Sequence, residues 1–435
     1  MRTFFALPVF RFFYRNIHVS GKRTKSDRGA VIFAPNHQNA LMDAICILCT
    51  ENRQPVFVAR ADIFNKPYIV RLLHFLHILP IYRKRDGVNV MDNNQETFDI
   101  LLKILLHGRA VGIMPEGTHN KIKRLQMLQK GIFRIALKAQ ESYGRQRGIR
   151  IVPVGLEYSD TRKFRSDVII HYGEALEMAD YYDLYAENPA KAFRTLQRVL
   201  SERMKSGMIH IENEAFYQEI EWARRVWEQP VVRQLGLKCD GAGRLKAQQV
   251  IVAALEKLAR DDQDAMRQLC ARIGEYARIL EKYRLRDWVT AHQPYSLPLL
   301  LMRTLLLFAG IPFWLAGILF NYLPYKLSEK ASAKVKDPQF ISSVRFVAGV
   351  VLFPLYYLIV AVLSVIFIPC AWGKIAIIVL LLPSGLFAFE FYLSVKKLFA
   401  RYRFRRHGKD AEICKAVELR KNILEVLKKI TTANP

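Results

Sequence analysis

Acidic residues and cysteines are the scarce components of this 435-residue chain. Asp and Glu number 39 against 66 Lys and Arg, so the formal net charge is +27. Of the six cysteines, only Cys46 and Cys49 stand close together, inside an apolar run. That distribution excludes a disulfide scaffold, does not fit the spacing of a zinc site, and indicates a reducing compartment. We therefore expect neither a metal nor a bound cofactor.

Low-complexity stretches are missing too, since 51% of the residues are hydrophobic and 24% are charged. Such a composition supports a folded core and excludes a largely disordered chain. The cationic excess predicts a polyanionic partner, which is nucleic acid, a phosphorylated substrate or an anionic membrane surface. No nucleic-acid recognition motif with interleaved aromatic residues is present, so anionic membrane lipid is the simpler expectation.

Long apolar runs are confined to residues 297–395. Residues 346–372 carry no charge, and residues 375–393 contain a single one, Glu390. Each is close to the roughly 20 apolar residues that a membrane span needs. They predict a transmembrane hairpin whose turn, at 373–374, lies on the far side of the membrane.

Basic residues flank this hairpin on both sides, which decides how we interpret the third apolar run, 297–323. The flanking cations are Lys326, Lys330, Lys334, Lys336 and Arg345 before it, and Lys396, Lys397, Arg401, Arg403, Arg405 and Arg406 after it. The positive-inside rule places both flanks in the cytoplasm, which two full spans satisfy and three do not. We expect 297–323 to be a re-entrant or in-plane element broken at Pro312, with a third span as the alternative. The prediction is an integral protein of a bacterial inner membrane whose N-terminal domain faces the cytoplasm.

The first 29 residues are not typical of a signal peptide. Arg11 and Arg15 interrupt their apolar stretch, and no small-residue cleavage site follows. Aromatic residues mixed with arginines favour a helix that lies in the headgroup region of a membrane. We expect residues 1–29 to be such an interfacial helix; the alternative is an ordinary first helix packed on a core.

Short apolar runs alternate with helical patterns over residues 30–175. The predicted strands are 30–35, 55–59, 77–82, 110–114, 149–155 and 167–172, and the predicted helices lie near 40–50, 66–76, 91–107 and 130–142. Strands separated by helices of this length predict an α/β domain with a mixed sheet flanked by helices. In such sheets the chemistry collects in the loops beyond the carboxyl ends of the strands.

The strand pattern ends before residues 176–296, which are rich in Ala, Leu, Arg and Glu. This stretch predicts a helical subdomain, including an antiparallel pair over 242–286 that turns near Asp261 and Asp262. No chemistry can be assigned to it. After the membrane region, residues 396–435 form a basic C-terminal tail.

A histidine and an aspartate follow the predicted strand 30–35. The motif reads Pro35-Asn36-His37-Gln38-Asn39-Ala40-Leu41-Met42-Asp43. A carboxylate at this position can hold the imidazole in one tautomer and stabilise its cation. His37 is then a competent general base for a hydroxyl, with Asp43 as its partner. Alone, a His and an Asp at this spacing occur often by chance.

Further motifs also lie at predicted strands. In Met114-Pro115-Glu116-Gly117-Thr118-His119, the carboxylate of Glu116 can accept hydrogen bonds from polyol hydroxyls, and Gly117 lets the backbone approach a ligand closely. In Ile81-Tyr82-Arg83-Lys84-Arg85, three adjacent cations suit a phosphate, which arginine binds in bidentate fashion. A fourth block, Val152-Pro153-Val154, lies in the strand 149–155.

In their order along the chain, the blocks at 35–43, 81–85, 114–119 and 152–154 resemble the glycerolipid acyltransferase superfamily, and within it the 1-acyl-sn-glycerol-3-phosphate acyltransferases. NHQNALMD resembles the catalytic His-Asp block, and VPV resembles the fourth block. The blocks around Arg83 and Glu116 resemble the two acceptor-binding blocks. The resemblance covers residues 30–175, and the ordered set is more specific than any one block.

The resemblance implies an enzyme that moves a fatty acyl group from acyl-CoA or acyl carrier protein to 1-acyl-sn-glycerol-3-phosphate, giving phosphatidic acid. His37 would take the proton of the acceptor hydroxyl while Asp43 holds the imidazole in place. The implied substrate-binding residues are Arg83 for the acceptor phosphate, and Glu116, Gly117 and Thr118 for the glycerol.

Two departures from the family pattern bear on the acceptor. The commonest first block has four residues between its His and Asp, whereas five separate His37 from Asp43; one extra residue turns the aspartate by about 100° on a regular helix. In addition, the block around Glu116 usually ends in Arg, where this chain has His119. Further candidates for phosphate or donor contacts are Arg85, His119, Lys121, Lys123, Arg124 and Lys130.

Two alternatives therefore stay open. Glycerol-3-phosphate is the other acceptor, because blocks with five intervening residues also occur among glycerol-3-phosphate acyltransferases, and because the C-terminal membrane region is large. From a different class, a non-catalytic membrane protein could bind anionic lipid through a decayed site, although His37, Asp43, Glu116 and Gly117 are all intact.

Overall fold

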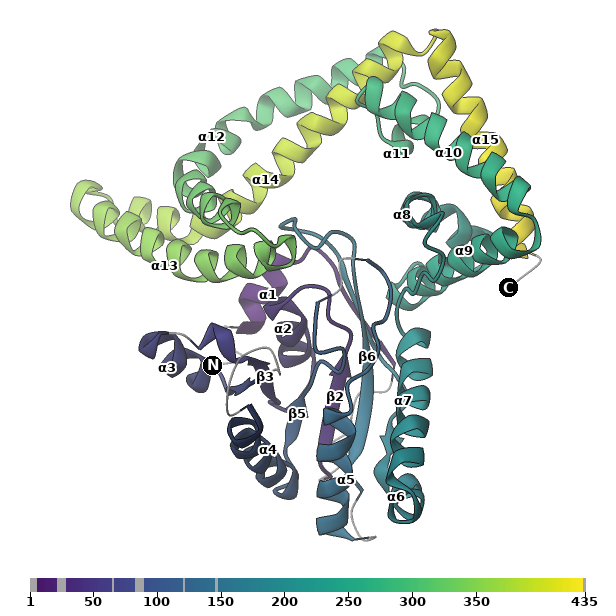
Figure 1. Cartoon of the computed structure of the whole chain (residues 1–435). Coiled ribbons are helices and arrows are strands. Elements are labelled where there is room, and N and C mark those ends of the chain that lie inside the picture. Colours follow the sequence, from purple (N-terminus) through teal and green to yellow (C-terminus); the bar gives the residue numbers. More distant parts are fainter. Residues whose placement is uncertain are drawn as a thin grey trace. The chain divides into compact units, whose positions relative to one another are not determined.

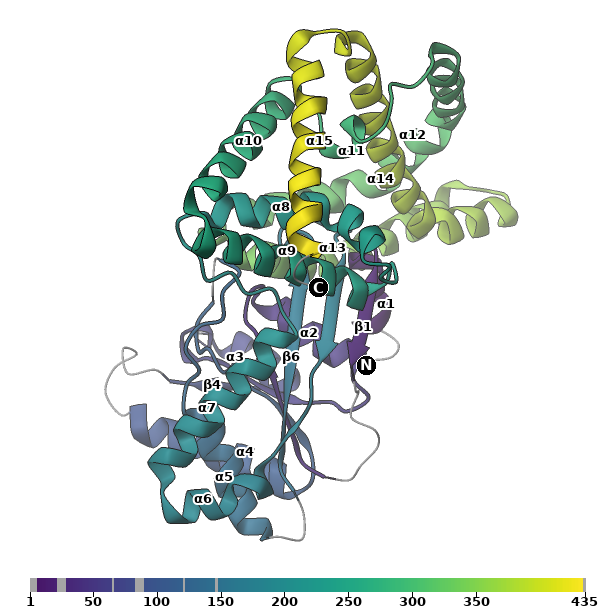
Figure 2. The same cartoon turned by 90° about the vertical axis from the view of Figure 1, so that its right-hand side faces the viewer.

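The computed structural model describes residues 6–21, 29–64, 66–82, 90–119, 122–144 and 148–432, and Figures 1 and 2 show it in two views. The chain divides into two compact units. The first comprises residues 1–212 and 236–249, and the second comprises residues 213–235 and 250–435. The first unit contains the sheet and the second is helical.

The first unit is built around an eight-stranded mixed sheet. Its strands are β1 Ile17–Gly21, β2 Val31–Pro35, β3 Val56–Arg60, β4 Ile78–Ile81, β5 Ala110–Gly112, β6 Arg150–Tyr158, β7 Val168–Tyr172 and β8 Leu176–Glu177. Their order is β1-β7-β6-β2-β5-β3-β4, with β8 paired to β6. β6 pairs antiparallel with β7 and β8, and the other neighbours are parallel. The six predicted strands and the mixed α/β class are confirmed.

Helices cover both faces of this sheet (Figure 1). They are α1 Leu7–Phe13, α2 Leu41–Thr50, α3 Pro67–Phe75, α4 Val90–Leu106, α5 Gly131–Tyr143, α6 Tyr182–Glu187 and α7 Pro189–Ser206. The main core lies under α4, α5 and α7, where Leu105, Phe133 and Leu200 pack with Ile32 and Ile151 of the sheet. Because side chains alternate between the faces of a strand, the residues next to Ile32 and Ile151 point to the face that α2 covers.

The described part of the N-terminal segment, residues 6–21, contributes side chains to the core of this unit. Phe10 and Phe13 of α1 are buried, and Tyr14 is buried directly after them. The following residues form β1, which pairs with β7 at the edge of the sheet. These three aromatic residues therefore fill a core, as in the alternative interpretation, and the interfacial position of the segment stays a prediction.

The second unit contains α8 Tyr217–Gln234, α10 Gln263–Lys282, α11 Asp287–Thr290, α12 Leu297–Ala333, α13 Ile341–Phe367, α14 Ala371–His407 and α15 Ala411–Thr432, and α9 Gly241–Asp261 belongs to both units. The predicted turn near Asp262 is confirmed, but α10 packs against α8 and α15. The predicted tail is also ordered: Ile423 and Leu427 of α15 are buried. Residues 411–432 therefore form an amphipathic helix, whose apolar positions alternate with basic residues in the sequence.

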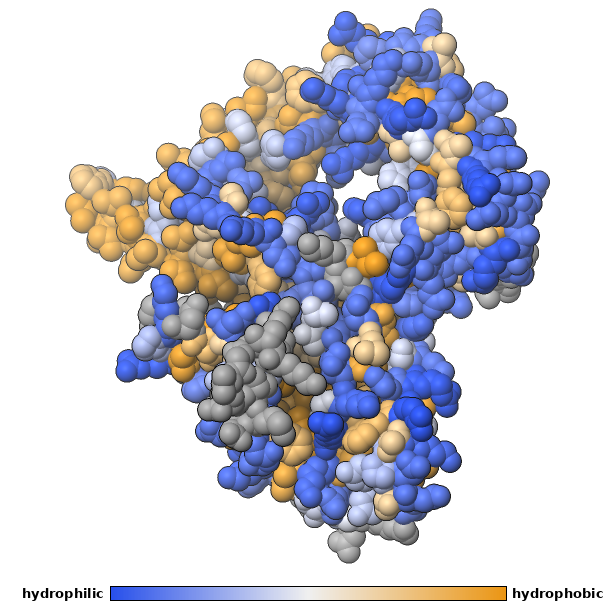
Figure 3. All heavy atoms as spheres, viewed as in Figure 1, coloured by the Kyte–Doolittle hydropathy of each residue, from blue (hydrophilic) through white to orange (hydrophobic). Residues whose placement is uncertain are grey.

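Three helices, α12, α13 and α14, are long and apolar enough to cross a membrane. Figure 3 shows hydrophobic residues gathered over them. Two expectations are corrected. α12 continues as one helix through Pro312 and Pro324, because proline bends a helix at the loss of one hydrogen bond without having to end it. The hairpin turns at residues 368–370, and the predicted turn at 373–374 lies in the first turn of α14.

α12 runs antiparallel to both helices of this hairpin. Against α14, the hydroxyls of Thr304 and Tyr402 lie 2.8 Å apart, and Nδ2 of Asn321 donates to the carbonyl of Leu381 at 3.1 Å. Against α13, the contacts are Ser332 with Arg345 at 3.2 Å and Asn321 with Tyr357 at 2.5 Å. Since α13 and α14 run in opposite directions, α12 changes direction near Asn321, and its curvature is visible in Figure 1.

Candidate active site

The two most informative motifs meet at one edge of the sheet because the strands before them are parallel neighbours. In the register of β2 and β5, Phe33 lies opposite Gly112. Both strands end within two residues of that pair, so the loops that start at Asn36 and Ile113 leave the sheet side by side. This is the edge at which open α/β sheets place their ligand sites.

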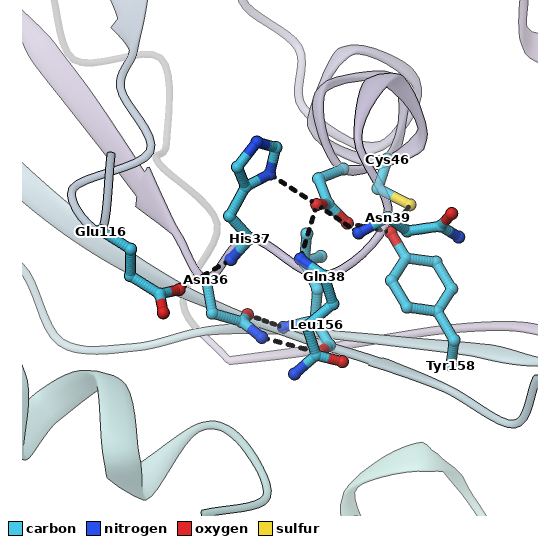
Figure 4. Close-up of polar contacts among 9 residues, drawn as sticks. Asn36, His37, Gln38, Asn39, Cys46, Glu116, Leu156 and Tyr158 are labelled. Carbon is cyan, nitrogen blue, oxygen red and sulfur yellow. Dashed lines mark hydrogen bonds and ion pairs between the residues drawn. The ribbon is translucent and has the colours of Figure 1, made fainter. Parts of the chain in front are cut away.

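His37 and Asp43 form a hydrogen-bonded pair, and Figure 4 shows His37 with the residues around it. Nδ1 of His37 lies 2.9 Å from Oδ2 of Asp43. The aspartate side chain is fully buried, whereas the imidazole is 15% exposed. An ionised carboxylate beside Nδ1 places the proton there and leaves Nε2 as an acceptor. The predicted pair is therefore present in the arrangement that a general base needs.

The five residues between His37 and Asp43 fit into the loop because the backbone turns sharply at Ala40. This alanine has φ 45° and ψ −122°, a left-handed φ that residues with a Cβ seldom adopt. A tight turn follows, in which the N–H of Met42 donates to the carbonyl of Asn39 at 2.9 Å. The extra residue is thus consumed before α2 begins, and the expected rotation of Asp43 away from His37 does not occur.

Four donors surround the carboxylate of Asp43. Besides His37, the backbone N–H groups of Gln38 and Asn39 donate to Oδ2 at 2.9 and 2.8 Å. The hydroxyl of Tyr158 donates to Oδ1 at 2.6 Å. Asp43 also lies in the first turn of α2, where the helix dipole favours a negative charge. The buried charge is therefore fully compensated by the fold itself.

Tyr158 is the functional residue that sequence reasoning missed. Burial, and next the charge of Asp43, hold the pKa of its phenol well above the usual value, so the hydroxyl stays a donor. It comes from β6, 115 residues after Asp43 in the sequence, and reaches α2 because β6 pairs with β2. Cys46 lies 3.4 Å from the same hydroxyl, and burial raises the pKa of its thiol, so Cys46 is not an activated nucleophile.

Glu116 holds the loop of His37 and is itself shielded from solvent. Its Oε1 accepts from the backbone N–H of His37 at 2.8 Å, and its Oε2 accepts from that of Gln126 at 2.9 Å. Only 3% of the residue is exposed. Burial raises the pKa of this carboxyl to about 7, against the two hydrogen bonds that lower it. The structure thus gives Glu116 a positioning contact with His37.

The residues after Glu116 reach the open side of the site. Gly117 has φ 66°, which favours glycine, and it is exposed together with Thr118. The ring of His119 lies on the ring of His37, with centroids 3.8 Å apart and planes 30° from parallel. His119, which stands where the family pattern has Arg, is therefore a direct neighbour of the candidate base.

The remaining predicted cations are distributed differently. Nζ of Lys123 lies 2.7 Å from Oε1 of Gln38 and 2.9 Å from Oε1 of Glu157, so this lysine is engaged beside the His37 loop. Arg124 binds the carbonyl of Ile211 at 3.0 Å, and Lys130 is exposed at the start of α5. The predicted contacts Arg83, Arg85 and Lys121 lie outside the described residues. Within the described ranges, no group of three or more His, Cys, Asp or Glu side chains could hold a metal ion.

Comparisons with known proteins agree with this geometry. Residues 16–157 match the family model "Acyltransferase". Glycerol-3-phosphate O-acyltransferase 2 of Saccharomyces cerevisiae is 30% identical over 145 residues, 32% of this chain and 19% of that protein. The chloroplastic 1-acyl-sn-glycerol-3-phosphate acyltransferase LPAT1 of Arabidopsis thaliana is 27% identical over 151 residues, 35% of this chain and 38% of that protein.

A similar result comes from a bacterial relative. The 1-acyl-sn-glycerol-3-phosphate acyltransferase of Borreliella burgdorferi is 26% identical over 157 residues, 36% of this chain and 57% of that protein. The chain thus spans less than two thirds of each of these relatives. The matched segment contains β1 to β5, all of β6 but its last residue, and the His37–Asp43 pair. Tyr158, the last residue of β6, lies directly after it. Residues 16–157 are therefore an acyltransferase domain.

Proposed function

We propose that the chain is a membrane-bound glycerolipid O-acyltransferase that acylates 1-acyl-sn-glycerol-3-phosphate to phosphatidic acid. The observation that carries the proposal is the contact between His37 and Asp43 at the open edge of an acyltransferase domain. A decayed, non-catalytic site would have no need of the four donors that keep Asp43 charged and aligned. The acyl donor is a thioester, acyl-CoA or acyl carrier protein.

The proposed reaction is a direct transfer. Nε2 of His37 takes the proton of the acceptor hydroxyl while the hydroxyl oxygen forms a C–O bond with the thioester carbon. Asp43 stabilises the imidazolium that results. When the tetrahedral intermediate collapses, the C–S bond breaks and the thiolate takes the proton back from His37. The products are an ester and a free thiol, and no acyl-enzyme is needed, in keeping with the raised pKa of Cys46.

Substrate binding is assigned from the residues around this pair. We propose that Arg83 binds the acceptor phosphate, as the family resemblance implies. Gly117 and Thr118 line the exposed side of the glycerol site. Glu116 contributes by fixing the backbone of His37, because both of its carboxylate oxygens already accept backbone N–H groups.

Glycerol-3-phosphate is the second candidate acceptor. Two observations favour it: the five residues between His37 and Asp43, and the similarity to the yeast protein whose name gives glycerol-3-phosphate as its acceptor. The chemistry at His37 is the same for both acceptors, because each presents a glycerol hydroxyl beside a phosphate.

The test is an assay of purified full-length protein with palmitoyl-CoA and each acceptor in turn, with the lipid product identified by mass spectrometry. We expect phosphatidic acid from 1-oleoyl-glycerol-3-phosphate, and none from the His37→Ala protein. Product from glycerol-3-phosphate alone would select the second candidate. No product from either acceptor, with a folded protein and with palmitoyl-CoA or palmitoyl-acyl carrier protein as the donor, would contradict the proposal.

We also propose that α13 and α14 cross the membrane and that α12 enters and leaves it on the cytoplasmic side. A straight third span could not run antiparallel to both helices of the hairpin, whereas a bent, re-entrant helix can. This keeps Lys336, after α12, and Lys409, after α14, on the side of the catalytic domain, as the positive-inside rule requires.

Single cysteines test this topology. Lys336 and Lys409 are exposed and lie outside the long apolar helices, so either can be replaced by cysteine in an active variant that lacks other cysteines. An impermeant thiol reagent added to intact cells should label neither until the membrane is opened. Labelling of Lys336→Cys alone in intact cells would show that α12 is a full span.

A further inference from the structure

A buried arginine with an unfilled hydrogen-bond donor lies where α12 and α14 meet. Arg401 of α14 is only 7% exposed, and its Nη1 has no hydrogen-bond partner in the described part of the chain. Its guanidinium lies against two aromatic rings, 4.1 Å from the centroid of Tyr295 and 4.8 Å from that of Trp288. Arg303 of α12 lies 5.0 Å from the same Tyr295 ring.

These contacts stabilise the arginine only in part. Aromatic rings interact with the face of a guanidinium through their π-electrons. The N–H groups point outward from its edge, in the guanidinium plane, and need acceptors of their own. Leaving a charged donor without one away from water costs free energy. Nη1 of Arg401 can therefore donate to an acceptor that the described residues do not supply.

The sequence around Arg303 and Arg401 is rich in cations, and Asp287, the carboxylate next to Trp288, is already bound by Arg420 at 2.8 Å. Residues 289–328 and 391–409 include no Asp or Glu. They carry Arg303, Lys326, Lys396, Lys397, Arg401, Arg403, Arg405, Arg406 and Lys409. Among the described residues, Arg303, Arg401, Arg403, Arg405 and Arg406 form no ion pair with a carboxylate. The missing acceptor is thus an anion from outside the chain.

The position of the site identifies the kind of anion. Leu305, Leu306 and Phe308 of α12 and Phe399 of α14 are exposed apolar residues directly beside the two arginines in sequence. On the other side, Arg405 donates to the carbonyl of Tyr295 at 2.8 Å, in the segment that precedes α12. Tryptophan and tyrosine are the residues that gather at the level of lipid headgroups.

We propose that Arg401 and Arg303 bind the phosphate of one anionic membrane lipid, with Trp288 and Tyr295 covering the guanidinium faces. The arginine fork offers two parallel N–H groups to phosphate oxygens, and the acyl chains lie along the exposed apolar residues of α12 and α14. The inference rests on the membrane insertion of these helices and is independent of the acyl transfer. It differs from diffuse attraction between basic residues and a membrane, because it assigns one lipid to one buried arginine.

Native mass spectrometry of the full-length protein in detergent tests the proposal. The protein is mixed with equal amounts of dioleoyl-phosphatidylglycerol and dioleoyl-phosphatidylcholine, and the lipid retained per chain is counted. We expect wild type to retain one phosphatidylglycerol. Arg401→Gln should retain at least tenfold less, and Arg401→Lys, which keeps the charge but loses the planar fork, should lie between the two. Arg406→Gln is the matched control: it removes the same charge from the same helix end and should stay within twofold of wild type.

Several outcomes would overturn the proposal. Equal losses in Arg401→Gln and Arg406→Gln would reduce the effect to net charge. Equal retention of both lipids would mean that the anionic headgroup is not recognised, and displacement of phosphatidylglycerol by an equal concentration of inorganic phosphate would replace the lipid by a free phosphate. Circular dichroism confirms that each variant is folded. Since lipid retention is read and not turnover, failure here is separate from failure of the acyltransferase assay.

Discussion

Asp43 and Arg401 are both buried charged side chains, but they differ in how many of their hydrogen-bonding groups find a partner within the chain. Asp43 accepts from two backbone N–H groups, an imidazole and a phenol, so every neighbour that its charge needs comes from within the first unit. Arg401 has aromatic rings on its faces and keeps a donor without a partner among the described residues. A buried charge costs several kcal/mol unless it is paired and hydrogen-bonded.

The site of Asp43 is fully hydrogen-bonded without a ligand, whereas we propose that the site of Arg401 needs a bound lipid to satisfy its free donor. The carboxylate of Asp43 is fixed before any substrate arrives, so its role is to orient His37 and to stabilise the imidazolium during transfer. Nη1 of Arg401 has no such partner in the part of the chain that the structure describes, and this is why we assign it a lipid. Removing a partner of Asp43 should therefore lower a rate, whereas replacing Arg401 should change which lipid is retained.

The largest effect on the complete site should come from Asp43→Asn. The amide cannot accept from all four donors, and its NH₂ group competes for Nδ1 of His37, which favours the wrong imidazole tautomer. We expect kcat for acyl transfer to fall at least about 100-fold, the loss expected when a general base is disabled. The KM for palmitoyl-CoA should change little. A kcat within a few-fold of wild type would show that the pair does not work as a unit.

Glu116 is a buried carboxylate like Asp43, but it accepts hydrogen bonds from two backbone N–H groups where Asp43 has four donors. The carboxyl has a pKa of about 7 in the folded chain against 4.5 ordinarily, so between these values the folded state keeps a proton that the unfolded state has lost. The contribution of Glu116 to the unfolding free energy should be fully present below pH 4.5 and be lost as the pH rises to 7, by up to about 3 kcal/mol for a shift of this size.

Thermal unfolding in detergent from pH 5 to 8 measures this effect. Glu116→Gln has no carboxyl to titrate, so the unfolding free energy of wild type minus that of the variant should decrease as the pH rises. A difference that is the same at every pH would mean that Glu116 stays ionised, as its two hydrogen bonds alone would favour.

Tyr158→Phe removes one of the four donors of Asp43 and leaves the ring in place. A hydrogen bond to a charged group contributes about 1.5–3 kcal/mol, so kcat should fall roughly 10-fold or more while both KM values stay near wild type. Tyr172→Phe is the control, because its hydroxyl binds Thr50 at 2.8 Å. If both variants lose activity equally, the loss comes from the packing of the aromatic core and not from Asp43.

The smallest effect is expected at the backbone of Ala40. Its positive φ stores about 1–3 kcal/mol of strain, which glycine would relieve at the cost of a more flexible unfolded chain. Ala40→Gly should therefore keep full activity and raise the unfolding free energy by about 1 kcal/mol or less. Ala40→Val should lower it, since a β-branched residue tolerates this conformation least. A destabilised glycine variant would contradict a strained loop.

The sheet and the His37–Asp43 pair could be predicted because their signals are local. Strand 30–35 is a short apolar run, and the two candidate catalytic residues follow it within eight positions. Tyr158 could not be assigned in this way, since its contact with Asp43 depends on the pairing of β6 with β2. The alternation of side chains along β6 would have marked Tyr158 only once that register was known.

The errors also have physical reasons. Aromatic residues with arginines fit an interfacial helix and a buried helix equally well, and the sequence does not show that Phe10 packs into the core. Pro312 predicted a helix end, but the helix needs only to bend there, which is what allows α12 to follow both α14 and α13. The backbone donors to Glu116 cannot be seen in the sequence, so its contact with His37 could not be predicted, and its role in binding the substrate stays a prediction.

The most direct test of the central claim is a single-turnover measurement with purified full-length protein in excess over palmitoyl-CoA, in the presence of 1-oleoyl-glycerol-3-phosphate. Wild type and Arg401→Gln should both form phosphatidic acid at comparable rates, while His37→Ala should be slower by about 10²–10⁴-fold. The intact mass of wild type, quenched during turnover, should show no bound acyl group. Transfer by His37→Ala within a few-fold of wild type, or a palmitoylated protein that passes its acyl group to the acceptor, would contradict direct transfer by the His37–Asp43 pair.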